Sequence, residues 1–190
     1  MKADGNFDKN RKIGLASALI ALFFMLCNLV ACDSTKQIPK PPLVLPFVVQ
    51  LAGNKVETEL QVHEHRSYIF YLQLGFVEKD PEDRERVKKL AGDYERNKEG
   101  KLLKPGVAVP LRLKISVIDS FPEKTLLERE ILEEEMWAYG ADNFKKQIAI
   151  VPLKPGHYRV SLESLKDAPE LVGTPIAFGI GFYAKATSIK

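Results

Sequence analysis

The chain has 190 residues, which is enough for one domain of ordinary size and a short additional segment. A hydrophobic fraction of 45% and a charged fraction of 28% are typical of a globular protein and exclude a wholly disordered chain. The net charge is only +3, and most of this excess arises before residue 13, so the remaining chain gives no electrostatic reason to expect nucleic-acid binding.

Residues 1–31 have the layout of a secretory signal peptide. Residues 1–12 are polar and net basic, and residues 13–30 are apolar apart from Ser17 and Asn28. A charged segment followed by an apolar one is the arrangement of such a signal. A transmembrane anchor is the alternative, because about 18 apolar residues is near the minimum that crosses a bilayer. Length alone leaves both open.

The end of the apolar run separates these alternatives. Leu29-Val30-Ala31-Cys32 resembles the bacterial lipobox, in which the thiol receives a diacylglycerol and a peptidase cuts before the cysteine. The resemblance implies removal of residues 1–31, cleavage between Ala31 and Cys32, and a covalent diacylglycerol and N-acyl chain on Cys32. One acyl chain binds a membrane only marginally, whereas two or three hold a protein there. We therefore expect a lipoprotein whose partner is the membrane, with no other cofactor.

Asp33 bears on which membrane carries the anchor. An aspartate directly after the lipidated cysteine resembles the enterobacterial signal that opposes transfer to the outer membrane. It favours the periplasmic face of the inner membrane over the outer membrane, and an ordinary polar linker residue is the alternative. Cys27 lies in the removed segment, so the mature chain would have no free thiol and no disulfide.

A proline-rich segment follows the lipidated cysteine. Residues 34–46 read STKQIPKPPLVLP. Proline fixes φ and lacks an amide donor, so this segment should be extended, at about 3.1 Å per residue. We predict a tether over residues 32–46 and one domain over residues 47–190.

The next segments predict strands around one helix. Residues 56–62 (VETELQV) and 107–119 (VAVPLRLKISVID) alternate apolar and polar residues, and residues 68–77 (YIFYLQLGFV) suit a buried strand. Pro110 would lie at an edge or bulge. Residues 81–94 (PEDRERVKKLAGDY) begin with proline and acids, and Gly92 can end a helix there. The basic residues of this helix could attract lipid headgroups near the tether, but interspersed acids favour a solvated face.

Residues 125–139 are ambiguous. TLLEREIL could open an amphipathic helix that continues into EEEMW. We favour a strand over residues 125–132, because residues 116–131 place two apolar runs around a short proline-containing turn, as in a hairpin. The helical alternative stays open.

The C-terminal third predicts three more elements. Residues 147–153 form a strand, Lys154-Pro155-Gly156 a turn, and residues 157–165 the returning strand. Residues 176–184 (IAFGIGFYA) form the last strand, in which Gly179 and Gly181 indicate a bulge or a close backbone approach. About eight strands with one short inserted helix predict a mainly β fold, an antiparallel β-sandwich of Ig-like or jelly-roll-like type.

Two groups of side chains are candidates for a binding site. His63 and His65 alternate and could share a metal ion, but two ligands do not make a site, and a polar turn explains them equally well, so we predict no metal. Trp137 and Tyr139 follow three glutamates, and exposed aromatic residues beside charge can contact a sugar or a protein. Burial of the only tryptophan in the core is the alternative.

The sequence gives little support for catalysis. It has no GxSxG elbow and no phosphate-binding glycine loop, and acylation of Cys32 would leave no thiol nucleophile. We therefore expect that the protein is not an enzyme.

Two segments resemble a known family. They are residues 86–115 (RVKKLAGDYERNKEGKLLKPGVAVPLRLKI) and 153–182 (LKPGHYRVSLESLKDAPELVGTPIAFGIGF). Both resemble a proteobacterial lipoprotein family known as a domain of unknown function. The resemblance implies an exported β-rich domain and brings no catalytic residues.

These observations favour a membrane-anchored periplasmic lipoprotein that is a non-catalytic binding or interaction module of the cell envelope. Its loops or a sheet edge would contact another protein or an envelope polymer. The alternative is a periplasmic immunity or inhibitor protein directed against a toxic enzyme. An enzyme is the class that the sequence favours least.

Overall fold

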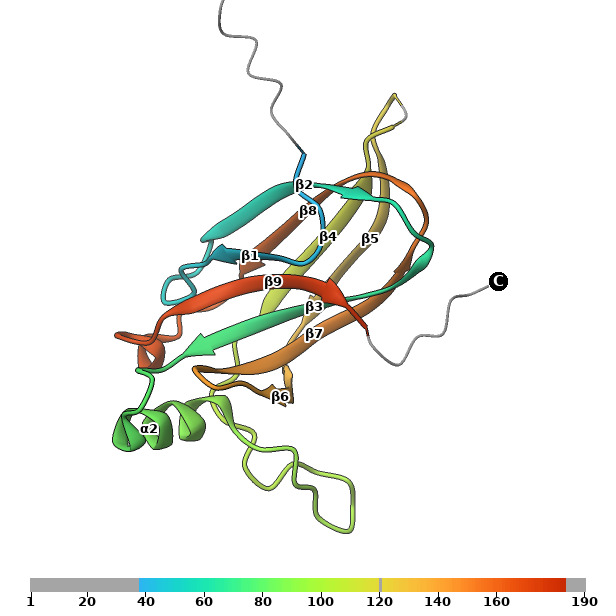
Figure 1. Cartoon of the computed structure of the whole chain (residues 1–190). Coiled ribbons are helices and arrows are strands. Elements are labelled where there is room, and N and C mark those ends of the chain that lie inside the picture. Colours follow the sequence, from blue (N-terminus) through green and yellow to red (C-terminus); the bar gives the residue numbers. More distant parts are fainter. Residues whose placement is uncertain (1–37, 120, 184–190) are drawn as a thin grey trace, which may run out of the picture. The chain divides into compact units, whose positions relative to one another are not determined.

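Alternating apolar and polar residues arrange the chain into two antiparallel sheets that pack face to face (Figure 1). The computed structural model describes residues 38–119 and 121–183, so Ala31, Cys32 and Asp33 lie outside the described residues. The predicted mainly β, antiparallel sandwich with one short α-helix is confirmed for this part of the chain. No helix within the described ranges is long and apolar enough to cross a membrane.

The larger sheet has five strands and the smaller one four. In spatial order, the five-stranded sheet contains β1 (Leu43–Pro46), β9 (Ile176–Phe182), β3 (Arg66–Gly75), β7 (Asn143–Leu153) and β6 (Glu135–Tyr139). The four-stranded sheet contains β2 (Lys55–Val62), β8 (Gly156–Ser164), β4 (Leu111–Val117) and β5 (Lys124–Ile131). A 3-10 turn, η1 (Pro169–Leu171), precedes β9.

The core lies between the two sheets. On β3 the inward residues are Tyr68, Phe70, Leu72 and Leu74, which are all buried. The outer face of the four-stranded sheet carries charged ladders instead, such as Arg112 with Glu130 at 2.8 Å and Lys114 with Glu128 at 3.3 Å. One face in the core and one in water is the usual pattern of an antiparallel sheet.

The ambiguous segment over residues 125–139 is β. Strand β5 pairs antiparallel with β4 as a hairpin, with Ile115 opposite Leu127, and β6 follows as a separate strand. The preferred hairpin is confirmed and the helical alternative is wrong. Glu128 and Glu130 lie on the outer face, and Arg129 reaches across to donate to the Ile148 carbonyl at 3.1 Å, so three charged residues in a row gave the segment its helix-like composition.

The helix α2 (Pro81–Ala91) ends three residues before its predicted limit. Asp80 caps its N-terminus by accepting from the amides of Glu82 and Asp83 at 3.0 Å. Gly92 follows at φ 86°, a left-handed conformation that favours glycine and stops the helix.

Three other predictions need correction. Leu43–Pro46, assigned to the tether, is strand β1 and pairs with β9. The turn at 154–156 does not join a hairpin, because β7 and β8 belong to different sheets, and the chain crosses between them there. Strand β4 begins after Pro110, so this proline lies outside the sheet.

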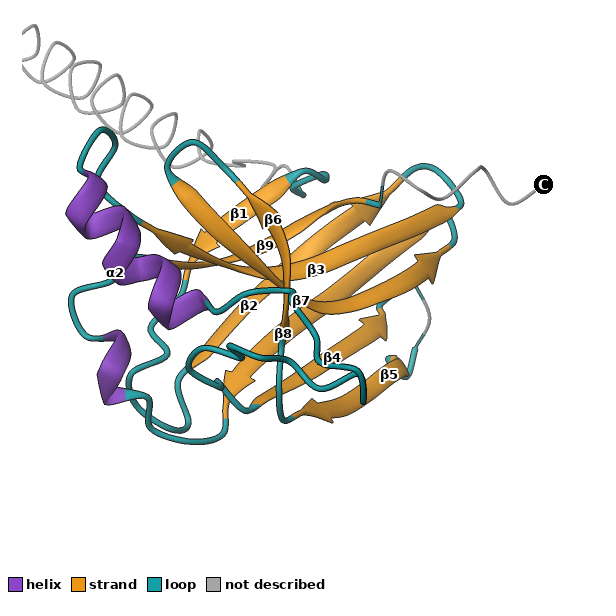
Figure 2. Ribbon diagram, turned by 90° about the horizontal axis from the view of Figure 1, so that it is seen from below, coloured by secondary structure: helices purple, strands orange, loops and turns teal. Residues whose placement is uncertain are grey.

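The sandwich has two distinct ends. At the tether end, where the described chain begins, the Gln61 amide donates to the Pro39 carbonyl at 2.9 Å. Gln61 is opposite His157, and the His157 amide donates to Asp119 at 2.7 Å. The tether end therefore gathers the β2–β3, β4–β5 and β7–β8 turns and the end of β9. The distal end carries α2, the 92–110 loop, β6 and η1 (Figures 1 and 2).

Candidate functional site

Strand β6 forms an edge of the five-stranded sheet at the distal end. Its pairing with β7 shifts register between Met136 and Ala138, so Trp137 is an extra residue in a β-bulge. A bulge redirects a side chain. Met136 is buried in the core, whereas Trp137 is 37% exposed and Tyr139 is 41% exposed. The core alternative for the tryptophan is therefore wrong, and both predicted binding residues lie at the surface.

Trp137 lies against a tyrosine that is held flat on the sheet. The rings of Trp137 and Tyr71 are 5.7 Å apart, and the Lys145 ammonium is 5.0 Å from the centre of the Tyr71 ring. Tyr71 covers the backbone of Gly179, where a Cβ would lie 2.1 Å from the ring. The close backbone approach predicted for β9 is thus present, and it fixes the surface on which Trp137 rests.

Tyr139 belongs to a second aromatic cluster. Its ring meets Tyr94 edge-on at 5.9 Å and Phe144 edge-on at 5.5 Å. Its hydroxyl donates to the Asp93 carboxylate at 3.1 Å. The β6 site therefore consists of two clusters along the edge strand: Tyr71, Trp137 and Lys145 on the outer face of the sheet, and Asp93, Tyr94 and Tyr139 on the side of Phe144, which points into the core.

The protonation states of the polar pair follow from its surroundings. Loss of hydration, followed by the hydrogen bond and negative charge of Asp93, raises the pKa of Tyr139 to about 12. The Tyr94 amide, and to a smaller extent the Tyr139 hydroxyl, lower the pKa of Asp93. At neutral pH Tyr139 is a neutral donor and Asp93 is a carboxylate.

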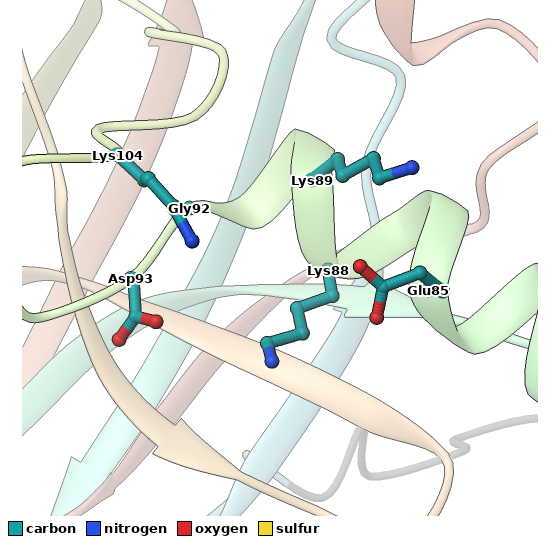
Figure 3. Close-up of a pocket in the computed structure, with 6 residues that line it drawn as sticks. All are labelled: Glu85, Lys88, Lys89, Gly92, Asp93 and Lys104. Atoms are coloured by element: carbon teal, nitrogen blue, oxygen red, sulfur yellow. The ribbon is translucent and has the colours of Figure 1, made fainter.

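A hollow of about 270 Å³ adjoins Asp93 and is lined by Glu85, Lys88, Lys89, Gly92, Asp93 and Lys104 (Figure 3). At Gly92 the backbone packs directly against the backbone at Pro105, because a Cβ on Gly92 would lie 2.5 Å from the Pro105 carbonyl carbon. Figure 3 shows the Lys88 side chain between Asp93 and Glu85, with Lys89 extending away from Asp93. The mixed charges make the hollow polar without a strong net sign.

A buried ion pair supports this end of the sandwich. Lys146 and Glu134 are 3.3 Å apart, with side chains 2% and 0% exposed. The Lys146 ammonium donates to the Val107 carbonyl at 2.8 Å, and Glu134 accepts from the Val109 amide at 3.3 Å. Burial raises the pKa of Glu134 and lowers the pKa of Lys146, so the loss of hydration outweighs their attraction. The pair fastens the 92–110 loop to β7 and to the segment before β6.

The histidines do not form a metal site. His63 and His65 lie in the β2–β3 turn, and His157 is near them in space but pairs with Asp119 at 2.6 Å. Over residues 38–119 and 121–183, no group of three His, Cys, Asp or Glu side chains could hold a metal ion.

Several residues of the site could not be predicted from the sequence. Asp93, Tyr71 and Lys145 are remote from β6 in the chain, and no local pattern connects them to it. Lys146 did carry a signal, since it alternates with Phe144 and Ile148, which point into the core.

Comparisons with other proteins identify a family and a fold. The family model described as a domain of unknown function, DUF5625, matches residues 44–182. A crystal structure of a protein from Sulfurospirillum deleyianum has a TM-score of 0.62 and 22% sequence identity, covering 76% of this chain and 98% of that chain. This likeness concerns the fold. No curated protein matches the chain.

Proposed function

We propose that this chain, which belongs to the DUF5625 family of domains of unknown function, is a lipoprotein anchored in a bacterial membrane and facing the periplasm. It binds a protein or polymer of the cell envelope through the β6 site, without catalysing a reaction. The observation that carries the proposal is the exposure of Trp137 and Tyr139 on an edge strand at the distal end.

The anchoring part rests on the lipobox-like sequence before Cys32 and on the apolar segment before it. Two or three acyl chains on Cys32 would hold the protein on the membrane. The described chain begins at the tether end, and the β6 site lies at the opposite end of the sandwich.

The binding part rests on the chemistry of the site. Tryptophan and tyrosine are enriched among the residues that dominate binding energy, and they gain most where rigid neighbours hold them. Trp137 rests on Tyr71, and Tyr139 is held by Tyr94 and by Asp93. The edge strand therefore offers one preordered aromatic ring on each side of the sheet: Trp137 rests on Tyr71, which the Lys145 ammonium also contacts, and Tyr139 lies beside the ionised Asp93 carboxylate.

Site-specific photocrosslinking in cells tests the binding part. A photoreactive phenylalanine analogue at position 137 of the full chain should give a defined adduct, and the same analogue at position 126 should not. Leu126 is the matched control because it is 48% exposed on β5, in the other sheet. A discrete band indicates a protein, and a ladder that collapses on glycan hydrolysis indicates a polymer. Equal labelling at both positions, or none at 137, would contradict the proposal.

Membrane fractionation tests the anchoring part. Cys32→Ala should abolish acyl labelling and release the protein from the membrane fraction, with Cys27→Ala as the matched control that changes neither. A Cys32→Ala protein that is still lipidated would refute the anchor.

A further inference from the structure

We propose that the tether end of the sandwich docks on the surface of the bilayer in which Cys32 is anchored. In this arrangement Phe121 inserts at the boundary between headgroups and acyl chains, and Lys40, Lys124 and Lys154 contact anionic headgroups. The inference rests on the proposed lipid anchor and goes beyond it, because an anchor alone leaves the domain free to reorient.

The first argument is the length of chain between the anchor and the domain. The predicted tether ended at residue 46, but β1 begins at Leu43 and the Pro39 carbonyl already accepts from Gln61. Only five residues lie between Cys32 and Ile38, and the six Cα–Cα steps that join them span at most about 20 Å when fully extended. The tether end is therefore confined close to the bilayer.

The second argument is an exposed aromatic side chain at this end. Phe121 is 102% exposed, the largest value among the exposed large hydrophobic residues of the described chain. It lies in the β4–β5 turn, which projects beyond the neighbouring strands in Figure 1. The base of the turn is fixed, because Asp119 accepts from the His157 amide and pairs with its ring. A large apolar side chain held in this way suits insertion into a membrane interface.

The third argument is charge. The acids of this end already have basic partners: Glu64 pairs with Arg66 at 3.5 Å, Asp119 contacts the His157 ring at 2.6 Å, and Glu123 shares Arg159 with Glu57 and Glu59. Lys40, Lys124 and Lys154 are exposed and make no ion pair with the described residues. Three available ammonium groups around an apolar tip complement an anionic lipid surface.

Docking in this way also orients the molecule. The distal end, including α2 and the β6 site, would face the periplasm (Figure 2). The basic residues of α2 would then lie away from the bilayer, contrary to the idea that they meet headgroups near the tether.

A fluorescent probe in the full lipidated chain tests the proposal. Phe121→Cys carries the probe NBD, and Leu103→Cys is the matched control because Leu103 is 57% exposed in the distal 92–110 loop. The proteins are reconstituted into vesicles of phosphatidylethanolamine and phosphatidylglycerol with brominated acyl chains. We expect blue-shifted emission and strong quenching at position 121 and neither at 103. Equal, weak quenching at both positions would overturn the docking. An emission shift that depends on protein concentration would also overturn it, because position 121 would then be covered by a second copy of the protein.

Charge reversal provides an independent readout. Lys124→Glu with Lys154→Glu should lower the equilibrium constant for docking by at least about five-fold per lysine, and replacing phosphatidylglycerol by phosphatidylcholine should act in the same direction. Lys98→Glu with Lys101→Glu, in the distal loop, should have no effect. Vesicle flotation distinguishes failure of the lipid anchor from failure of docking. A protein that floats with the vesicles but whose probe at position 121 is unquenched refutes docking alone. A protein that does not float with the vesicles refutes both the anchor and the docking.

Discussion

Replacing Lys146 by methionine should destabilise the domain by about 3 to 5 kcal/mol, because it leaves Glu134 as an uncompensated charge in the core. The side chains of Lys146 and Glu134 are 2% and 0% exposed, so water cannot take the place of the missing partner. The Val107 carbonyl also loses its donor. In a domain of this size such a loss corresponds to a fall in Tm of roughly 6 to 20 °C.

Neutralising the remaining charge should recover most of this loss. In Glu134→Gln with Lys146→Met no buried charge is left, and the amide oxygen can still accept from Val109. The free energy of unfolding of the double variant should therefore lie within about 2 kcal/mol of that of the natural protein. The neighbouring, half-buried Lys145 provides the control: Lys145→Met loses only its contact with the Tyr71 ring and should cost about 1 kcal/mol or less.

The pH dependence of the single variant follows from the buried carboxyl. Burial raises the pKa of Glu134 above its ordinary value of 4.5, and removing Lys146 removes the cation that opposes this shift. A carboxyl whose pKa is raised on folding contributes stability that is fully present below its unfolded pKa and is lost as the pH rises through the folded pKa. The gap between Lys146→Met and the double variant should therefore widen with pH, by up to about 1.4 kcal/mol per unit.

Urea unfolding followed by circular dichroism, between about pH 5 and about pH 8, measures each of these differences. A Lys146→Met protein as stable as Lys145→Met, or a gap to the double variant that does not change with pH, would refute the reasoning. Either result would mean that the Glu134 charge is relieved by rearrangement of the 92–110 loop.

Three further predictions concern other parts of the chain. Gly179→Ala should cost about 1 to 3 kcal/mol and alter the fluorescence of the single tryptophan, because its Cβ would lie 2.1 Å from the Tyr71 ring. Gly181→Ala, where that ring is 3.6 Å away, should stay within about 1 kcal/mol by the same unfolding assay. Tyr139→Phe should remove a late step, near pH 12, from the alkaline titration of tyrosinate absorbance, and an unchanged titration curve would count against the hydrogen bond to Asp93. Asp33→Ser should move the lipoprotein to the outer membrane in fractionated cells, and an unchanged distribution would argue against a sorting role.

The sequence predicted most individual elements correctly, because their signals are local. The alternation in VETELQV and LRLKISV produced β2 and β4, and Pro81 with Gly92 marked the helix. The proline-containing turn between two apolar runs identified the β4–β5 hairpin. Each of these signals depends on neighbours within a few positions of the chain.

The sequence did not predict how the strands assemble. The turn at 154–156 looks like a hairpin turn, yet β7 pairs with β3 and β6 while β8 pairs with β2 and β4. Strand β1 was hidden among prolines, because its place in the sheet depends on β9, more than 130 residues later. Sheet membership is decided by pairing between remote segments, which leaves no periodic signal.

The candidate site shows the same division. The sequence by itself determined that Trp137 and Tyr139 follow three glutamates, because residue identity and order are enough for that. Only the tertiary structure decided that a bulge turns Trp137 outward onto Tyr71, that Asp93 accepts from Tyr139, and that the site lies opposite the tether end. These relations arise from pairing and packing between segments far apart in the chain, and such contacts cannot be predicted from a local sequence pattern.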